Sequence, residues 1–190
     1  MATLQTPGEM EAAMLKNLKE SIGFSLDEVM DAVEQSGLEK HGQIQKFLHK
    51  EIGMKYGFAS VLAAIYLNGK KPVYGDPDAL LMDQYEKTPH LRTIYDELIK
   101  RITSKFDLKI GVCKGYVSVI AKQQCLILNP RKEGLWVALN LPQEAIDSSV
   151  QDPKKLNVPP KFNAGIVLTS IEEVDEELMA NVQLSILKFS

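Results

Sequence analysis

Apolar positions recur every three or four residues through the first seventy residues of the chain, and glycines separate the apolar runs. This spacing is typical of amphipathic helices. It predicts four short helices, which end at Gly23, Gly37, Gly53 and Gly69. The first is expected to run without a break from Pro7 to Gly23. Because the connections are short, the helices are expected to pack as neighbours in a bundle.

Local signals support the second of these helices and the corner that follows it. Ser25 and Glu28 have the S-x-x-E spacing of a capping box, in which each side chain satisfies a backbone N–H of the other residue. Gly37 is placed to end the helix in the left-handed conformation. His41, at the start of the next helix, is expected to hydrogen-bond to backbone.

The segment Gly69–Pro77 contains two prolines and two glycines in nine positions, which is typical of a domain boundary. We therefore predict a helical domain over residues 1–69, a linker over 70–77 and a second domain over 78–190. The second domain opens with two predicted helices, Asp78–Tyr85 and a longer one from Pro89 to about Lys105.

Beyond Lys105 the pattern changes from helical to strand-like. Four β-rich runs are separated by short turns and predict an antiparallel meander: Leu108–Cys113, Tyr116–Ala121, Cys125–Asn129 and Leu135–Leu141. A proline-rich connection over 142–162 leads to a further strand, Ala164–Thr169, and to a helix that Ser170 caps and that runs through Lys188. The expected class is α+β, with an N-terminal short-helix bundle followed by a β-meander with flanking helices.

Two of the predicted strands are apolar on both faces. Leu126–Leu128 and Leu135–Leu139 lack the alternation of a sheet with one solvated face, so both faces of the sheet need cover. The helices of the second domain can cover one face. The other requires the N-terminal helices, the 142–162 connection or a second copy of the chain, which makes a homodimer one of the alternatives.

Two stretches of the sequence resemble known families. The corner Ser36–Gly42 with its flanking helices resembles a bacterial domain of unknown function, number 4287. The block Tyr74–Tyr95, with Lys114–Tyr116, is similar to a second bacterial domain of unknown function, number 5655. Proteins that carry the second domain are often labelled "predicted transport protein". The first resemblance departs from its pattern at Tyr56, where that family usually has a histidine.

Composition places the chain among ordinary water-soluble globular proteins, with 45% hydrophobic and 25% charged residues. A formal charge of −3 argues against a generic polyanion binder, although it can hide a local basic patch. The first residues do not resemble a signal peptide, and no apolar run approaches the roughly 20 residues of a membrane span, so we expect a cytoplasmic location and no membrane span. The two cysteines, Cys113 and Cys125, are expected to be buried strand residues at opposite ends of one strand.

The sequence contains no recognisable catalytic motif. It has no GxSxG, P-loop, dinucleotide fingerprint or paired-acid motif, so we expect no cofactor and regard catalysis as less favoured than binding. His41 and His49 lack the spacing of a metal pair on one helical face, and no third ligand accompanies them. We therefore assign no catalytic residue and no metal site.

Charge is unevenly distributed along the second domain. Between Lys100 and Lys132 there are eight basic residues and one acidic residue. If they converged on one surface, they would form a candidate nucleic-acid interface. The candidates are Lys100, Arg101, Lys105, Lys114, Lys122, Arg131 and Lys132.

Two functional hypotheses follow. The first is a noncatalytic binding or interaction module for a nucleic acid or a protein. The alternative is a small-ligand binder or enzyme with a pocket between the sheet and the 142–162 connection. Arg92, Tyr116 and Trp136 are the candidate ligand-binding residues of that pocket.

Overall fold

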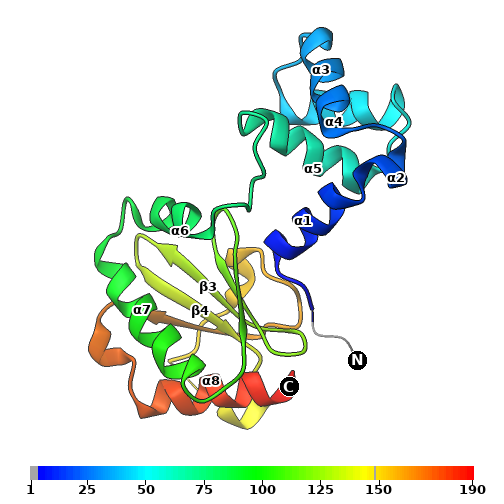
Figure 1. Cartoon of the computed structure of the whole chain (residues 1–190). Helices are drawn as coiled ribbons and strands as arrows, with labels where there is room; N and C mark the ends of the chain where they lie inside the picture. The colour runs from blue at the N-terminus through cyan, green and yellow to red at the C-terminus, as the bar shows by residue number, and fades with distance from the viewer. Residues whose placement is uncertain (1–3, 148) are drawn as a thin grey trace. The chain divides into compact units, whose positions relative to one another are not determined.

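The computed structural model describes residues 4–147 and 149–190; the first three residues of the predicted helical domain and residue 148 of the long connection lie outside that description. Contacts divide the chain into two compact units. Residues Pro7–Asp76 form a helical unit, and the described residues of Pro77–Ser190 form an α+β unit together with residues 4–6. Figure 1 shows the helices and strands of each unit.

The helical unit contains short helices around one apolar core. They are α1 (Pro7–Lys16), α2 (Leu18–Ile22), α3 (Leu26–Ser36), α4 (His41–Lys50) and α5 (Tyr56–Leu67). The prediction of one unbroken helix up to Gly23 was wrong, because Asn17 takes a non-helical conformation and separates α1 from α2. Asparagine competes with the helix through local hydrogen bonds, which makes it a favourable place for such a break.

The predicted corner between α3 and α4 is present. The Ser25 N–H donates to Glu28 Oε2 at 2.7 Å, and the Glu28 N–H donates to Ser25 Oγ at 3.3 Å, which confirms the capping box. Gly37 ends α3 with φ = 66°, a conformation that residues with a Cβ rarely adopt. His41 Nε2 donates to the Ser60 carbonyl in α5 at 3.1 Å. The corner thus joins α4 to α5 through a backbone contact and has an architectural role.

The end of the helical unit is held by a buried acid. Glu11 is 5% exposed and is the buried residue of α1. Its carboxylate accepts the backbone N–H groups of Val73 at 3.0 Å and Tyr74 at 2.8 Å. Val73 also packs in the apolar core of the helical unit. The segment predicted as a linker over 70–77 is therefore fixed to the first helix of the chain up to Tyr74.

The α+β unit begins with two helices, α6 (Pro77–Tyr85) and α7 (His90–Thr103). Among the described residues, five strands then form one antiparallel sheet in the order of the sequence. They are β1 (Lys109–Val112), β2 (Val117–Ile120), β3 (Gln124–Arg131), β4 (Gly134–Leu139) and β5 (Ala164–Leu168), and α8 (Glu176–Lys188) ends the chain. The protein is α+β, as the sequence predicts.

The start of the last helix differs from the prediction. Ser170 precedes only a short 3-10 helix, η3 (Ile171–Glu173), and the long helix α8 starts after Asp175. Asp175 Oδ1 accepts the backbone N–H of Leu178 at 2.9 Å, so a second cap is present five residues after the predicted one. A carboxylate at this position also complements the helix dipole.

One face of the sheet is covered by helices. Figure 1 shows α7 and α8 on one side of the sheet and the segment between β4 and β5 on the other. On the helical side, residues of α6, α7 and α8 pack against Val119, Leu126, Leu128 and Val137 in the largest apolar cluster. Leu91 and Leu98 of α7 are fully buried there, on the stripe expected from the sequence.

The other face is covered by the connection that follows β4. Leu156, in the 3-10 helix η2 (Pro153–Leu156), and Phe162 pack against Ile127 and Trp136. A single bridge between Gln151 and Gly165 ties the same connection to β5. The chain itself therefore supplies cover for the second apolar face, and the apolar pattern no longer requires a second copy of the protein.

Candidate functional site

Register brings two of the sheet's turns to the same end. In the β1–β2 hairpin, Val112 pairs with Val117, and in the β3–β4 hairpin, Arg131 pairs with Gly134. Since Val117 also pairs with Leu128 of β3, both turns lie at one end of the sheet. The basic and aromatic residues of these turns are therefore neighbours although some 15 positions separate them in the sequence.

A groove of about 640 Å³ lies at this end of the sheet, and we call it the hairpin-end groove. It is lined by the end of α6, the β1–β2 turn, the end of β3 and the residues after η2. The lining combines cations (Lys87, Lys114, Arg131), amides (Gln84, Asn129, Asn157), acids (Asp83, Glu86) and the ring of Tyr116. Its volume is within the range of about 300–1,000 Å³ that is common for ligand sites.

Gln84 joins α6 to the turn that forms one wall of the groove. Its Nε2 donates to the carbonyl of Cys113 at 2.6 Å and, more weakly, to that of Tyr116 at 3.4 Å. Its Oε1 is buried and accepts no hydrogen bond from the described residues. Carbonyl groups accept from the NH₂ group of an amide but cannot donate to its oxygen. Gln84 therefore holds the turn through its NH₂ group, while its oxygen remains without a donor.

Asn129 is the least exposed amide of the lining. It lies on β3 beside Trp136 of β4, and only 6% of its surface is exposed. Within the described part of the chain, its side chain makes no hydrogen bond, and its backbone pairs with that of Trp136 in the β3–β4 ladder. The amide atoms are not among the buried polar atoms that lack a partner, so they reach the groove, where a ligand can pair with them in place of water.

The rim opposite the β1–β2 turn is formed by the connection. Asn157 follows η2 with φ = 54°, a left-handed conformation that asparagine tolerates better than most residues. Leu156, beside it, lies 7% exposed with one side in the apolar cluster under the sheet. The groove is thus bounded on this side by the same connection that the sequence predicts to cover a pocket.

The three residues predicted to bind a small ligand do not come together. Tyr116 lines the groove and is 37% exposed. Arg92 lies on α7, where its Nε donates to Asp96 Oδ1 at 2.8 Å. Trp136 has no exposed surface; its Nε1 donates to Glu133 Oε1 at 3.1 Å, and Lys155 Nζ lies 4.1 Å from the ring centre. Of the three, only Tyr116 lines the groove.

The seven basic candidates divide between the two ends of the sheet. Lys114 and Arg131 line the hairpin-end groove, and Lys132 follows Arg131 in the same turn. Lys122 lies at the opposite end, where Lys109 pairs with Ile120.

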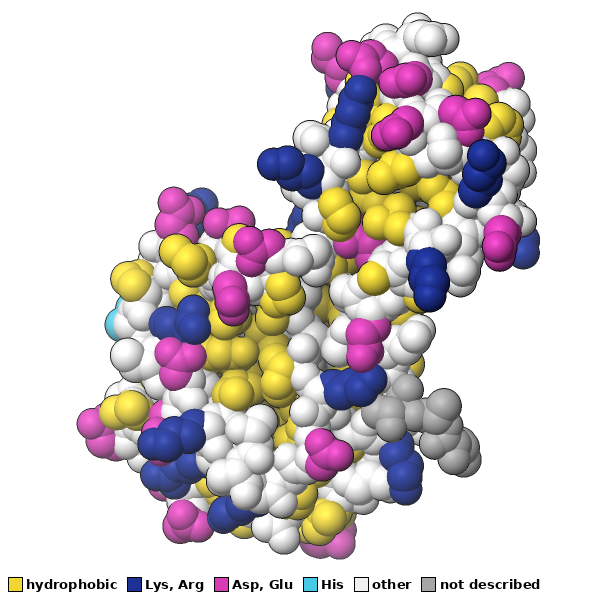
Figure 2. Space-filling view, viewed as in Figure 1, with side chains coloured by type: hydrophobic (Ala, Val, Ile, Leu, Met, Phe, Trp, Pro, Cys, Tyr) yellow, Lys and Arg dark blue, Asp and Glu magenta, His cyan; other side chains and the backbone are white. Residues whose placement is uncertain are grey.

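The remaining three basic candidates lie where α7 ends and the chain enters β1, which is the Lys122 end of the sheet. They are Lys100, Arg101 and Lys105. The carboxylate of Glu97 pairs with Arg101 Nε at 2.8 Å and with Lys100 Nζ at 3.8 Å. On the face shown in Figure 2, the Lys and Arg side chains of this unit are interspersed with Asp and Glu and form no continuous basic surface.

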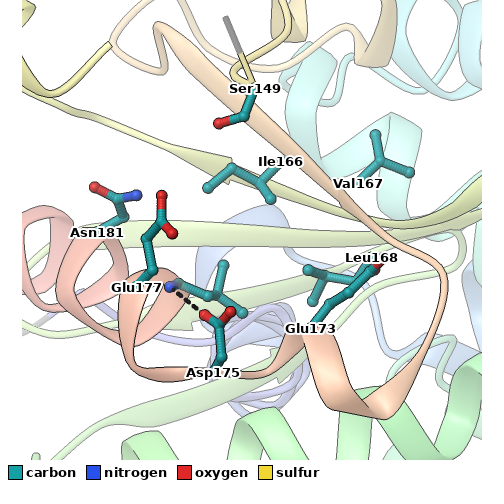
Figure 3. A pocket seen from close by; sticks show the side chains of 9 residues that line it. Ser149, Ile166, Val167, Leu168, Glu173, Asp175, Glu177 and Asn181 are labelled. Atoms are coloured by element: carbon teal, nitrogen blue, oxygen red, sulfur yellow. Dashed lines mark hydrogen bonds between the residues drawn. The ribbon is translucent and has the colours of Figure 1, made fainter. Parts of the chain in front are cut away.

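A second hollow lies between β5 and the start of α8, and its lining is acidic. Figure 3 shows Glu173, Asp175 and Glu177 around it, with Ser149 and Asn181. Two of these carboxylates already have backbone partners: Glu173 Oε2 accepts the N–H of Thr169 at 2.6 Å, and Asp175 caps α8. No group of three metal-binding side chains was found in the described part of the chain. Two of the three acids of this hollow therefore already serve as helix caps.

Both cysteines are buried and carry free thiols. Cys113 directly follows β1 and precedes Lys114 of the groove, and Cys125 lies on β3 near the opposite end of the sheet. Burial raises the pKa of the Cys113 thiol, and a hydrogen bond with Tyr116 offsets only part of that rise. Burial also raises the pKa of Cys125 to about 11. Neither thiol has the lowered pKa of a reactive nucleophile.

The architecture defines the class of protein as a helical domain followed by an α+β domain with an antiparallel meander. The family model described as Domain of unknown function (DUF5655) matches residues 82–184, which is over half of the chain. The chain therefore belongs to this family. The model described as Domain of unknown function (DUF4287) matches residues 11–68.

No curated protein and no solved structure matches the chain. Every residue of the hairpin-end groove lies within the DUF5655 match. Among the described residues, no helix combines the length and apolar character needed to cross a membrane.

Sequence reasoning found part of this site. It singled out Lys114, Tyr116 and Arg131 but missed Gln84 and Asn129. Asn129 carries a signal in hindsight, because it is an amide directly after the apolar run Cys125–Leu128. Gln84 carries none, because a glutamine on a helix surface is ordinary until the structure shows which carbonyls it meets.

Proposed function

We propose that the α+β domain is a noncatalytic binding module that takes an anionic ligand in the hairpin-end groove. The observation that carries this proposal is the convergence of Lys87, Lys114 and Arg131 from three separate segments around the unpaired amide of Asn129. Arginine and lysine are the side chains that bind phosphate and carboxylate groups, and the buried amide gives the site directional hydrogen bonds.

Binding is favoured over catalysis by the composition of the groove. Its described lining contains no histidine and no thiol, and its two acids, Asp83 and Glu86, both come from the α6 side. General acid–base or nucleophilic chemistry needs a base within hydrogen-bond reach of the reacting group. The thiol nearest to the groove, Cys113, is buried, and its pKa is raised.

The alternative of an interior pocket between the sheet and the 142–162 connection receives less support. Trp136, Leu156 and Phe162 pack into one apolar cluster between the two. The connection and the sheet share a ligand-sized space at their rim, where Leu156, Asn157 and Asn129 all line the groove. A small anionic molecule and a polyanion both fit a site at the rim.

The test is binding of fluorescein-labelled heparin, measured by fluorescence anisotropy at 50 and 200 mM salt. Each of Lys114→Ala and Arg131→Ala is expected to weaken binding by about two- to fivefold, because exposed charge pairs contribute up to about 1 kcal/mol. Lys122→Ala is the matched control, since it removes the same charge from a turn at the opposite end of the sheet. Equal losses in all three variants, or no binding by the unaltered protein, would contradict the proposal.

A further inference from the structure

We infer that the ligand of the hairpin-end groove is an unpaired nucleotide, either free or within a single strand, with its phosphate at Lys114 and Arg131, its base against Tyr116 and the base edge on Asn129. This inference rests on the proposed function and names the ligand class of the same site. Three features of the groove lead to it: the amide of Asn129, the exposed ring of Tyr116 and the uneven placement of cations and acids around the groove.

The amide suits a ligand with both hydrogen-bond donors and acceptors. Only 6% of the surface of Asn129 is exposed, and its side chain has no hydrogen-bond partner among the described residues. A sulfate ion offers only acceptors and leaves the amide oxygen without a donor, and inorganic phosphate has no planar edge that sets a donor beside an acceptor. A nucleobase edge offers a donor beside an acceptor, and an asparagine amide can pair with both at once.

The β1–β2 turn provides a surface for the face of a base. Tyr116 is 37% exposed at the groove, and the preceding Gly115 has open space where a side chain would project. A planar ligand can therefore approach the backbone of the turn and lie along the ring. Base–aromatic stacking is a common mode of single-strand recognition and tolerates any base.

Charge gives the ligand a direction. Lys114 adjoins the ring in the turn, and Arg131 lies at the end of β3, two residues beyond Asn129. The acids Asp83 and Glu86 come from the end of α6 and the residue just after it, on another wall. The cations of the two turns attract a phosphate, whereas the wall that carries Asp83 and Glu86 is less favourable for one although it also includes Lys87. Amino and hydroxyl groups of a base or sugar can donate to the two carboxylates.

The size and chemistry of the groove favour an unpaired nucleotide over a duplex. A volume of about 640 Å³ accommodates a ligand of nucleotide size and no stack of base pairs. Within a duplex, both faces of each base are stacked and the pairing edge is occupied. A site that uses the face and the edge of one base together can take only a base that is outside a duplex.

The test compares labelled decamers of each of the four bases with duplexes of the same sequences, by fluorescence anisotropy, and uses mononucleotides as competitors. We expect the single strands to bind at least about tenfold more tightly than the duplexes. Asn129→Leu is expected to weaken single-strand binding about tenfold without changing the slope of affinity against salt, because it removes no charge. Lys114→Ala is expected to reduce that slope by about 0.7.

Folding controls keep the result interpretable. Asn129→Leu replaces the amide by an apolar group of similar size, and unchanged far-UV circular dichroism and melting show that the variant is folded. If it does not fold, Asn129→Asp serves instead; it keeps the size, removes the donor and adds a negative charge, so a loss of more than tenfold is expected. Competition by mononucleotides identifies a free nucleotide as a sufficient ligand, and binding of strands alone identifies the single strand.

Failure of this inference and failure of the proposed function differ in their outcomes. Equal affinity for single strands and duplexes, or a folded Asn129→Leu variant with unchanged affinity, overturns the nucleotide assignment. Binding of heparin without binding of any strand or mononucleotide also overturns it and leaves the anion site in place. Binding of no anion at all overturns both.

Discussion

Replacing Glu11 tests whether one buried carboxylate holds the end of the helical unit to its first helix. Glu11 is 5% exposed, and its two oxygens accept the N–H groups of Val73 and Tyr74 at 3.0 and 2.8 Å. Both N–H groups follow the last helix of the unit, α5, and have this carboxylate as their acceptor. Glu11→Ala removes both hydrogen bonds, and Glu11→Gln removes one while it sets an NH₂ group against the other donor.

The expected loss of stability follows from the charge and burial of these bonds. A hydrogen bond to a charged group contributes about 1.5–3 kcal/mol to stability. Two such bonds, less the cost of burying the carboxylate itself, give an expected loss of about 2–4 kcal/mol for Glu11→Ala. For Glu11→Gln we expect about 1.5–3 kcal/mol. Domains are stable by only about 5–15 kcal/mol, so either loss is readily measured.

Urea unfolding followed by circular dichroism measures the total loss, and amide hydrogen exchange locates it. The amides of Val73 and Tyr74 are expected to exchange slowly in the unaltered protein and faster in both variants. Glu20→Gln, an exposed change of the same type on α2, is the control and is expected to cost less than about 0.5 kcal/mol. If Glu11→Gln costs no more than this control, or if the two amides keep their protection, the role assigned to Glu11 is wrong.

Three further predictions concern the α+β unit. Gly134→Ala is expected to lower the free energy of urea unfolding by about 2–4 kcal/mol, because φ is 148° and an added Cβ would lie 2.6 Å from a carbonyl oxygen of β5. An added Cβ at Gly115 meets no atom within 4 Å, so Gly115→Ala should be nearly neutral. Burial raises the pKa of Cys125 from its ordinary value of 9.0 to about 11, so its contribution to stability is full below pH 9 and is lost as the pH rises through 11. Cys125→Ala should flatten this part of the pH profile, and an unchanged profile would contradict the burial of the thiol. Acrylamide should quench the fluorescence of Trp136, the single tryptophan, only weakly. Lys155→Ala should increase this quenching, because it removes the side chain whose Nζ lies 4.1 Å from the ring centre. Strong quenching in the unaltered protein would show that the connection does not cover the sheet.

Several elements could be predicted because their causes are local. The capping box of Ser25 and Glu28, the left-handed Gly37 and the buried stripe of α7 each depend on residues within one or two helical turns of each other. The break at Asn17 and the second cap at Asp175 are also local, but other residues nearby carry the same kind of signal. Gly23 is a second place for the first helix to end, and Ser170 is a second cap for the last helix. Helix limits are the least certain part of such a prediction for this reason.

The site could be predicted only in part, because its residues meet through strand register. Lys114, Tyr116 and Arg131 are visible in the sequence as charged or aromatic turn residues. That Lys122 lies at the other end of the sheet follows from the predicted meander, because successive turns of an antiparallel meander lie at opposite ends. That Gln84 reaches the first turn follows from the packing of α6, which the sequence pattern does not give.

By itself, the sequence determined the α+β class, the order of the helices and strands and the need to cover both faces of the sheet, since these depend on periodicity and on the burial of apolar surface. The tertiary structure decided what met that need. It placed Leu156 and Phe162 of the connection against Trp136, turned Glu11 inward and brought only part of the basic residues to one groove. Hydrophobic burial has no direction and allows several kinds of cover, whereas hydrogen bonds and register are directional and select one of them.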